Sequence, residues 1–175
     1  LTAAQLLDSI NLERRAVEKD MQDQAVQMLE KMSFDADEQP LAYCLYDENW
    51  HQGVVGLLAS RIKERQHRPV IAFAPGDEGE VKGSARSIPG IHIRDVLALV
   101  AAQHPALLSK FGGHAMAAGL TIKQQDLAEF EQYFLSVLQS QVEPDVLEQS
   151  LHSDGEIEHE NISLVMAELL PNAAP

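Results

Sequence analysis

The stretch LAYCLYDENWHQGVVGLLASRIKERQHRPVIAFA, residues 41–74, holds two short apolar runs with a helical pattern between them. The two runs, residues 41–46 and residues 69–74, have the length and composition of buried β-strands. The apolar positions of residues 53–65 fall on one helical face, at Val54, Leu57, Leu58 and Ile62. A strand, a helix and a second strand within about 35 residues predict a parallel βαβ unit with a right-handed crossover.

Downstream of this unit, the pattern predicts strands that run in the opposite direction. GDEG, residues 76–79, predicts a turn, and EVKGSARSI, residues 80–88, predicts a strand that returns antiparallel. Helices are expected at residues 94–103 and 127–138, and a further strand at LTI, residues 120–122. The sequence therefore predicts an α/β fold, in which a mixed β-sheet is flanked by helices.

The segments on either side of this central part have different patterns. Residues 2–32 predict one long helix with a narrow apolar stripe, which is typical of a connector that packs against a neighbour. ISLVMAELL, residues 162–170, predicts a new short helix after an acidic stretch. We divide the chain into a connector helix at 1–36, a central domain at 40–142 and the start of a truncated further domain at 150–175. Because the chain begins without a methionine and ends without a closing element, we expect it to be a fragment of a longer protein.

The acidic residues are unevenly distributed along the chain. The formal net charge is −14, but residues 61–114 carry +3, whereas the segments before and after carry −7 and −10. Salt screens charges over about 8–10 Å, so the local field of the basic segment matters more to a ligand than the total charge. The composition therefore allows a polyanion such as nucleic acid as a partner.

Cysteine usage and hydropathy indicate the compartment. The chain has one cysteine, Cys44, which excludes an internal disulfide and the multi-cysteine zinc patterns, and its apolar surroundings are typical of a reduced thiol. No apolar run reaches the ~20 residues that a membrane-spanning helix needs. We therefore expect a cytoplasmic protein.

The segment FGGHAMAAGL, residues 111–120, places two glycines and a histidine before a run with helical character. Gly112 and Gly113 can expose backbone N–H donors, and residues 115–118 are expected to form a helical turn behind them. His114 adds positive charge when it is protonated. The segment predicts a phosphate-binding loop, and its alternative interpretation is a plain turn.

A second candidate site lies in GSARS, residues 83–87. In a strand, Ser84 and Arg86 project from the same face, and Gly83 leaves room beside them. A guanidinium can bind two oxygens of one phosphate, so this pair predicts an oxyanion clamp. The alternative is a solvated arginine between two serines.

A third candidate is NWHQGVVG, residues 49–56, at the turn from the first strand to the first helix. In open α/β sheets, ligands gather at the carboxyl ends of strands. Trp50 could stack on a base and His51 could contact a phosphate. The alternatives are a core aromatic for Trp50 and a satisfied polar group for His51.

The sequence lacks the usual patterns of a catalytic centre. It has no HxxxH pair, no HxE followed by CxxC, no DxDxDG loop and no GxSxG nucleophile. The acidic run at residues 152–160 is expected to be a solvated edge rather than a metal site. We therefore predict a chain that binds a phosphate but does not cleave one.

Four segments, taken in their order, carry a resemblance to a known family: WHQGVVGLLASRI (residues 50–62), RPVIAF (68–73), GSARS (83–87) and FGGHAMAAGL (111–120). Over residues 41–140 they resemble the DHHA1 domain of the DHH phosphoesterase superfamily, most closely that of its single-strand-specific exonucleases. The long helix before them resembles the connector from a catalytic DHH domain. The segment from Leu151 resembles the start of an OB-type domain.

The resemblance implies a division of labour between two domains. Mn²⁺ or Mg²⁺ ions would be held by a DHH domain that this chain lacks, while the DHHA1 domain would grip the backbone of single-stranded DNA, degraded from 5′ to 3′. By resemblance, the phosphate-binding residues are Ser84, Arg86, Gly112, Gly113 and His114, and further possible substrate contacts are Ser87, Trp50 and His51. The chain alone is expected to hold no metal and to be inactive, with its own DHH domain as a partner.

Three alternatives remain open at this stage. A DHH domain with a DHHA1 domain also occurs in phosphodiesterases that act on short oligonucleotides or nucleotides. The DHHA1 part of alanyl-tRNA synthetases is a non-catalytic module that binds RNA. An interaction domain without any ligand is the remaining possibility.

Overall fold

The computed structural model describes most of the chain, namely residues 3–31, 40–108, 110–148, 155–156 and 163–166. The expected further domain at residues 150–175, with its short helix, lies almost entirely outside these residues. In the described part, no helix is both long enough and apolar enough to cross a membrane.

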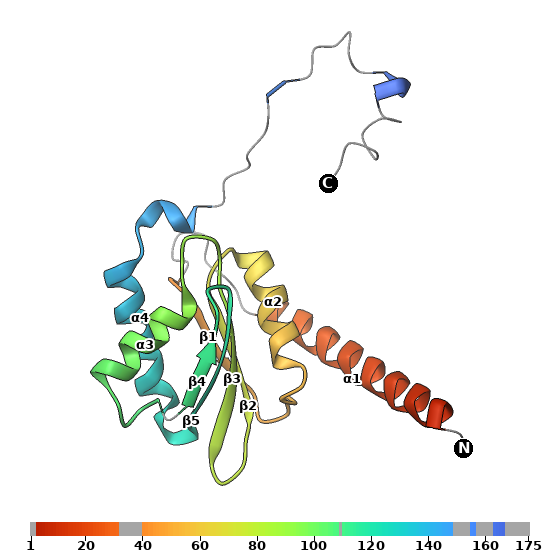
Figure 1. Ribbon diagram of the computed structural model, residues 1–175, viewed down its shortest axis with the longest axis horizontal. Helices are drawn as coiled ribbons and strands as arrows, with labels where there is room; N and C mark the ends of the chain where they lie inside the picture. The colour runs from red at the N-terminus through yellow and green to blue at the C-terminus, as the bar shows by residue number, and fades with distance from the viewer. Residues whose placement is uncertain (1–2, 32–39, 109, 149–154, 157–162, 167–175) are drawn as a thin grey trace.

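A five-stranded mixed sheet forms the middle layer of the molecule (Figure 1). Its strands are β1 (Tyr43–Tyr46), β2 (Val70–Pro75), β3 (Glu80–Arg86), β4 (Lys110–Gly113) and β5 (Ala117–Lys123), arranged in the order β1-β2-β3-β5-β4. Strands β1 and β2 are parallel, and every other pair is antiparallel. The prediction of an α/β fold with a mixed sheet is confirmed.

Helix α2 (Val55–Gln66) connects the two parallel strands, as the pattern of residues 41–74 predicts. Its buried side chains, including Leu58 and Ile62, pack on Val70 and Ala72 of β2. The helix ends at His67, which adopts the left-handed conformation with φ of 49°. The βαβ unit therefore forms because each of its three segments has an apolar surface that matches its neighbour.

Helices α3 (Ile93–Gln103) and α4 (Leu127–Gln141) cover the opposite face of the sheet (Figure 1). The larger core lies here, where Phe130 packs edge-on against Phe73 of β2 and parallel to Phe134, with ring centroids 5.8 Å apart in both pairs. The side chains of β3 and β5 that face these helices are buried. This layer therefore supplies most of the apolar burial that holds the sheet.

The α2 side of the sheet is covered over only part of its width. Helix α2 packs on β2 and β3, whereas β4 and the alternate residues of β5 are exposed or half-buried on this side. In β3 the burial alternates, so Lys82, Ser84 and Arg86 project from the α2 side while their neighbours enter the core. The strands β3, β5 and β4 thus offer an open face beside α2.

The GGH segment forms a β-hairpin, and the predicted helical turn at residues 115–118 is wrong. Gly113 ends β4, His114 begins the turn and donates its backbone N–H to the carbonyl oxygen of Ala117 at 2.8 Å, and Ala117 begins β5. Pairing of β5 with both β3 and β4 outweighs the helix preference of its alanines.

Helix α1 (Ala3–Lys31) is 29 residues long and extends away from the sheet (Figure 1). The prediction of one long helix at residues 2–32 is confirmed for residues 3–31, and positions 2 and 32 lie outside the described residues. Apolar side chains on it are exposed, among them Leu6, Leu7, Ile10, Leu12 and Val17.

Candidate phosphate-binding site

Arg86 is the last residue of β3 and lies half-buried between the sheet and α2. Its Nε donates to the hydroxyl of Ser60 at 3.1 Å, and its Nη1 donates to the hydroxyl of Ser84 at 2.9 Å and to the carbonyl oxygen of Ala85 at 2.9 Å. The predicted pairing of Ser84 with Arg86 on one face is confirmed. Three hydrogen bonds therefore fix the plane and direction of the guanidinium.

The approach of α2 to this arginine depends on a glycine. A Cβ atom at Gly56 would lie 2.7 Å from Nη2 of Arg86 and 3.0 Å from the hydroxyl oxygen of Ser84. Gly56 and Ser60 are four residues apart, so both lie on the side of α2 that faces β3. Sequence reasoning missed these two residues, although two small residues at this helical spacing were a signal of close contact with the sheet.

Among the described residues, Arg86 has no acidic partner. No carboxylate pairs with its guanidinium in the part of the chain that the structure describes, and Nη2 has no hydrogen-bond partner there. Burial lowers the pKa of Arg86 from its ordinary value. The nearby first turn of α2 contains no acidic residue, and its N-cap, Val54, offers no side-chain cap. An anion at Nη2 would compensate both the arginine and the positive end of the helix.

Gly112 lies on the same face as Ser84. It pairs with Gly119 of β5, which in turn pairs with Ser84 of β3, and residues in such cross-strand register share a face of the sheet. Two strand spacings place Gly112 about 10 Å from Ser84. A Cβ atom at Gly112 would meet no atom within 4 Å, so its lack of a side chain leaves open space on the α2 side.

Gly113 has a different role from Gly112. Its φ is +148°, and a Cβ atom there would collide with the carbonyl oxygen of Ala117 and lie 2.5 Å from Cα of Ala118. Only glycine fits this position without strain. Gly113 therefore shapes the hairpin that presents the exposed His114.

Of the three further candidates, Trp50 and Ser87 are buried and His51 is exposed. Trp50 is buried in the core under α2, and Ser87 is 1% exposed, with its hydroxyl donating to the carbonyl oxygen of Ile91 at 2.7 Å. Because both side chains are in the interior, we remove them from the candidate site. His51 is exposed and accepts a hydrogen bond from the backbone N–H of Gly53 through Nδ1 at 3.1 Å, which orders the turn before α2.

The geometry can be compared with known proteins. The family model for the DHHA1 domain matches residues 38–143, which is more than half of the chain. This chain belongs to the DHHA1 family. The match covers all five strands and the helices α2, α3 and α4.

Relatives of this DHHA1 chain extend the match beyond the domain. It is 47% identical over 169 residues to the single-stranded-DNA-specific exonuclease RecJ of Dickeya dadantii, and 44% identical over the same length to that of Escherichia coli. Each alignment covers 97% of the chain but 29% of the relative. The chain thus spans less than a third of the length of these relatives.

Solved structures match the DHHA1 fold in the same way. A structure of exonuclease RecJ bound to manganese superposes with a TM-score of 0.62 at 30% identity, covering 81% of this chain and 32% of that one. RecJ from Thermus thermophilus in complex with Mg²⁺ superposes with a TM-score of 0.58 at 30% identity, covering 77% and 19%. The mixed sheet with its flanking helices is therefore the RecJ type of DHHA1 fold.

A metal ion is usually held by three or more His, Cys, Asp or Glu side chains that converge on it. Among the residues that the structure describes, no three His, Cys, Asp or Glu side chains converge in this way. The described residues therefore do not fit the Mn²⁺ or Mg²⁺ that the sequence resemblance implies for the complete enzyme.

Proposed function

We propose that this DHHA1 domain grips a backbone phosphate of single-stranded DNA within a RecJ-like exonuclease that degrades DNA from 5′ to 3′. The observation that carries the proposal is Arg86, whose guanidinium is oriented by Ser84 and Ser60 and lacks a carboxylate partner among the described residues. Its Nη2, which has no hydrogen-bond partner among the described residues, lies against Gly56 in the first turn of α2. A phosphate there would receive charge-assisted hydrogen bonds from the guanidinium and bonds from the Ser84 hydroxyl.

The proposed contribution of this chain is positioning. Holding a phosphate in fixed geometry brings the scissile bond to the catalytic groups without a further loss of freedom at the moment of reaction. His114, exposed on the hairpin, and the open backbone at Gly112 would form the second wall of the site. We assign no catalytic residue to this chain.

The metal ions belong elsewhere in this proposal. We propose that Mn²⁺ or Mg²⁺ is bound by a DHH domain of the intact protein, for which α1 serves as the connector. When bound, such ions activate water and stabilise the charge of the leaving oxygen. The proposed compartment is the cytoplasm, where the single thiol of Cys44 stays reduced.

Replacement of Arg86 tests the proposal. In the intact protein that carries this chain, Arg86→Gln should lower exonuclease kcat/KM on single-stranded DNA about 10- to 100-fold, because hydrogen bonds to charged groups contribute about 1.5–3 kcal/mol. His114→Ala should also lower the rate, and metal binding should be unchanged in both variants. Near-normal kinetics in both variants would contradict the assigned roles.

Two controls accompany this test. Arg65→Gln removes an exposed positive charge from the last turn of α2, and its kinetics should match the wild type. The chain without a DHH domain should release no nucleotides in the presence of Mn²⁺. Robust release by the pure chain would contradict the proposed division of labour.

A further inference from the structure

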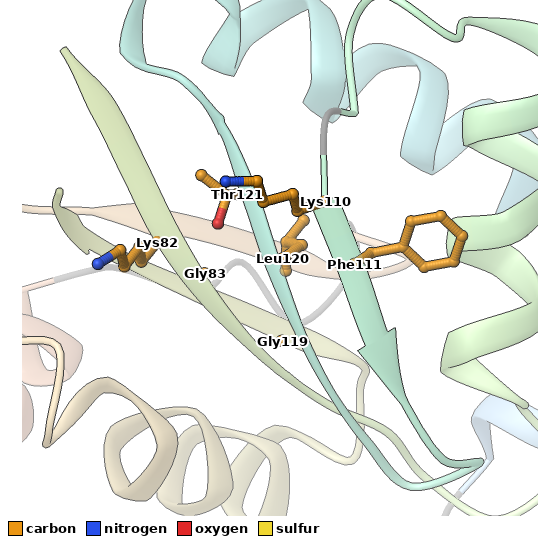
Figure 2. Close-up of a pocket in the computed structure, with 7 residues that line it drawn as sticks. All are labelled: Lys82, Gly83, Lys110, Phe111, Gly119, Leu120 and Thr121. Atoms are coloured by element: carbon orange, nitrogen blue, oxygen red, sulfur yellow. The ribbon is translucent and has the colours of Figure 1, made fainter. Parts of the chain in front are cut away.

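A hollow lies on the sheet at strands β3, β5 and β4, and neither Arg86 nor Ser84 lines it. Its volume is about 330 Å³, and Lys82, Lys110, Thr121 and Gly119 contribute to its lining. Figure 2 shows the lysines on strands that flank β5, with Thr121 between them. Neither lysine is used by the phosphate site described above.

The register of the sheet places these side chains in one row. Lys82 of β3 pairs with Thr121 of β5, which pairs with Lys110 of β4. Because residues in cross-strand register share a face, the three side chains, here called the lysine row, project to the α2 side. Figure 2 shows Lys110 directed toward Thr121, whereas Phe111 points the other way.

The neighbouring row forms a floor without bulky side chains. It consists of Ser84, Gly119 and Gly112, which pair across the same three strands. A Cβ atom at Gly112 would meet nothing within 4 Å, and one at Gly119 would meet only the carbonyl oxygen of Gly83, at 4.0 Å. Neither glycine has a positive φ, so neither is required by the backbone conformation. Because Gly112 and Gly119 have no side chains, a shallow trough over this row stays open between the lysine row and Arg86.

The charges around the lysine row leave it available to an anion. Lys82 lies 3.7 Å from the carboxylate of Asp77, but the Asp77 side chain is 88% exposed, and such surface pairs are weak. No carboxylate is paired with Lys110 in the described part of the chain. The next residue on this face of β3 beyond Lys82 is Glu80, which ends the run of positive and hydroxyl side chains.

We propose that the lysine row binds the next phosphodiester of the strand whose first phosphate is held by Arg86. Nη1 of Arg86 lies 2.9 Å from the Ser84 hydroxyl, so the first phosphate is placed at Ser84. Lys82 is two residues from Ser84 along β3, and two residues of a strand span about 7 Å, which is comparable with the distance between neighbouring phosphates of an extended strand. A sugar and base can pass over the glycine floor between them. The inference rests on the proposed function and adds a second phosphate subsite to it.

The test compares ligands with one phosphate and with several. Binding is measured by fluorescence anisotropy with a 5′-phosphorylated oligothymidylate of about ten nucleotides, in EDTA to prevent cleavage, and thymidine 5′-monophosphate serves as a competitor. In the intact protein, Lys82→Gln combined with Lys110→Gln should weaken oligonucleotide binding about 10-fold and reduce the salt dependence by about one to two counterions. Competition by the monophosphate should be unchanged.

Two controls make the outcomes distinguishable. Lys19→Gln removes an exposed charge from α1 and should leave both affinities unchanged. Arg86→Gln should weaken the oligonucleotide and the monophosphate alike. If only Arg86→Gln has an effect, the second subsite is wrong and the proposed function stands. If the double lysine variant weakens the binding of both ligands equally, the second subsite is also excluded. If the wild-type protein binds no oligonucleotide, both the second subsite and the proposed function are excluded.

A substitution in the floor gives an independent readout. Gly119→Val fills the trough with a side chain that favours strands, so the melting temperature should be maintained or raised. Oligonucleotide binding should nevertheless fall about 10-fold or more, because the sugar-phosphate backbone can no longer cross between the two subsites. Wild-type oligonucleotide affinity in a folded Gly119→Val protein would contradict the proposed path.

Discussion

At the scale of single residues, the guanidinium of Arg86 is positioned by two hydroxyls rather than by a carboxylate. An ion pair would hold the side chain equally well, but it would neutralise the charge that a phosphate needs. Hydrogen bonds to Ser60 and Ser84 orient the group and leave its charge uncompensated. The cost is the partial desolvation that lowers the pKa of Arg86.

The substitution Gly56→Ala keeps Arg86 but should displace its guanidinium, so it tests whether the position of the group matters. The new Cβ would lie 2.7 Å from Nη2, and the end of a flexible side chain can move away at little cost in stability. We therefore expect a nearly unchanged melting temperature and a loss of exonuclease activity approaching that of Arg86→Gln. Calorimetry and steady-state kinetics of the intact protein measure the two effects.

Gly53→Ala is the matched control, because a Cβ there meets only the exposed ring of His51, at 3.3 Å from Nδ1. It should retain activity. Equal losses in both variants would indicate that any disturbance of the turn before α2 lowers activity, and the argument from Arg86 would then fail.

At the scale of elements, the hairpin β4–β5 depends on one of its two adjacent glycines. Gly113→Ala should destabilise the fold by more than about 1 kcal/mol, because alanine at φ of +148° is strained and its methyl group would collide with the backbone of β5. Gly112→Ala should leave the stability unchanged or slightly raised. Denaturant unfolding of both variants tests this, and similar midpoints for the two would contradict the model of the hairpin.

Helix α4 carries a carboxyl group whose ionisation opposes folding. Burial raises the pKa of Glu131. The pKa of Cys44 on β1 is also raised, mainly by burial and to a smaller extent by the Glu131 carboxylate. Since folded Glu131 binds its proton more tightly than the unfolded chain does, its contribution to stability is largest at low pH and is lost as pH rises through the folded pKa. Glu131→Gln should therefore raise the melting temperature at neutral pH, and the gain should shrink as the pH falls through the raised pKa of Glu131 and the carboxyl becomes protonated in the folded protein.

The control for this prediction is Glu129→Gln, on the same helix but exposed. Its melting temperature at neutral pH should not exceed that of the wild type. A gain for Glu129→Gln as large as that for Glu131→Gln would point to a general charge effect, since the whole chain is acidic.

The elements differ in how far the sequence alone predicts them. The βαβ unit and the amphipathic helices α3 and α4 follow from apolar periodicity. Strand β4 does not, because KFGG is exposed along its whole length and has no alternating pattern. The alanines of β5 favour a helix locally, and only pairing with β3 and β4 makes them a strand.

In the candidate site too, some residues are predicted from the local pattern and others are placed only by the complete fold. Ser84 and Arg86 are predicted to share a face by the two-residue period of a strand, and they do. Gly56 and Ser60 come from another element, and their contact with Arg86 depends on how α2 crosses β3, which no local pattern specifies. Trp50 and Ser87 have the right chemistry for a ligand, but burial of their side chains is a property of the complete fold.

At the scale of the whole molecule, an acidic chain offers one open face with basic side chains. The sheet is covered by α3 and α4 on one side and partly by α2 on the other, so β3, β5 and β4 remain open on the α2 side (Figure 1). The central claim is that this open face binds phosphate through Arg86. Helix α2, which borders this face, also contacts α1, the proposed connector.

The most direct measurement is an NMR titration of the ¹⁵N-labelled chain with a 5′-phosphorylated thymidine dinucleotide. The account predicts that the Nε–H signal of Arg86 and the backbone amides of Ser84, Gly112 and Gly119 shift together and saturably, and that Arg86→Gln abolishes the shifts. Shifts confined to the α3–α4 side of the sheet, or shifts on the open face that persist in Arg86→Gln, would contradict it.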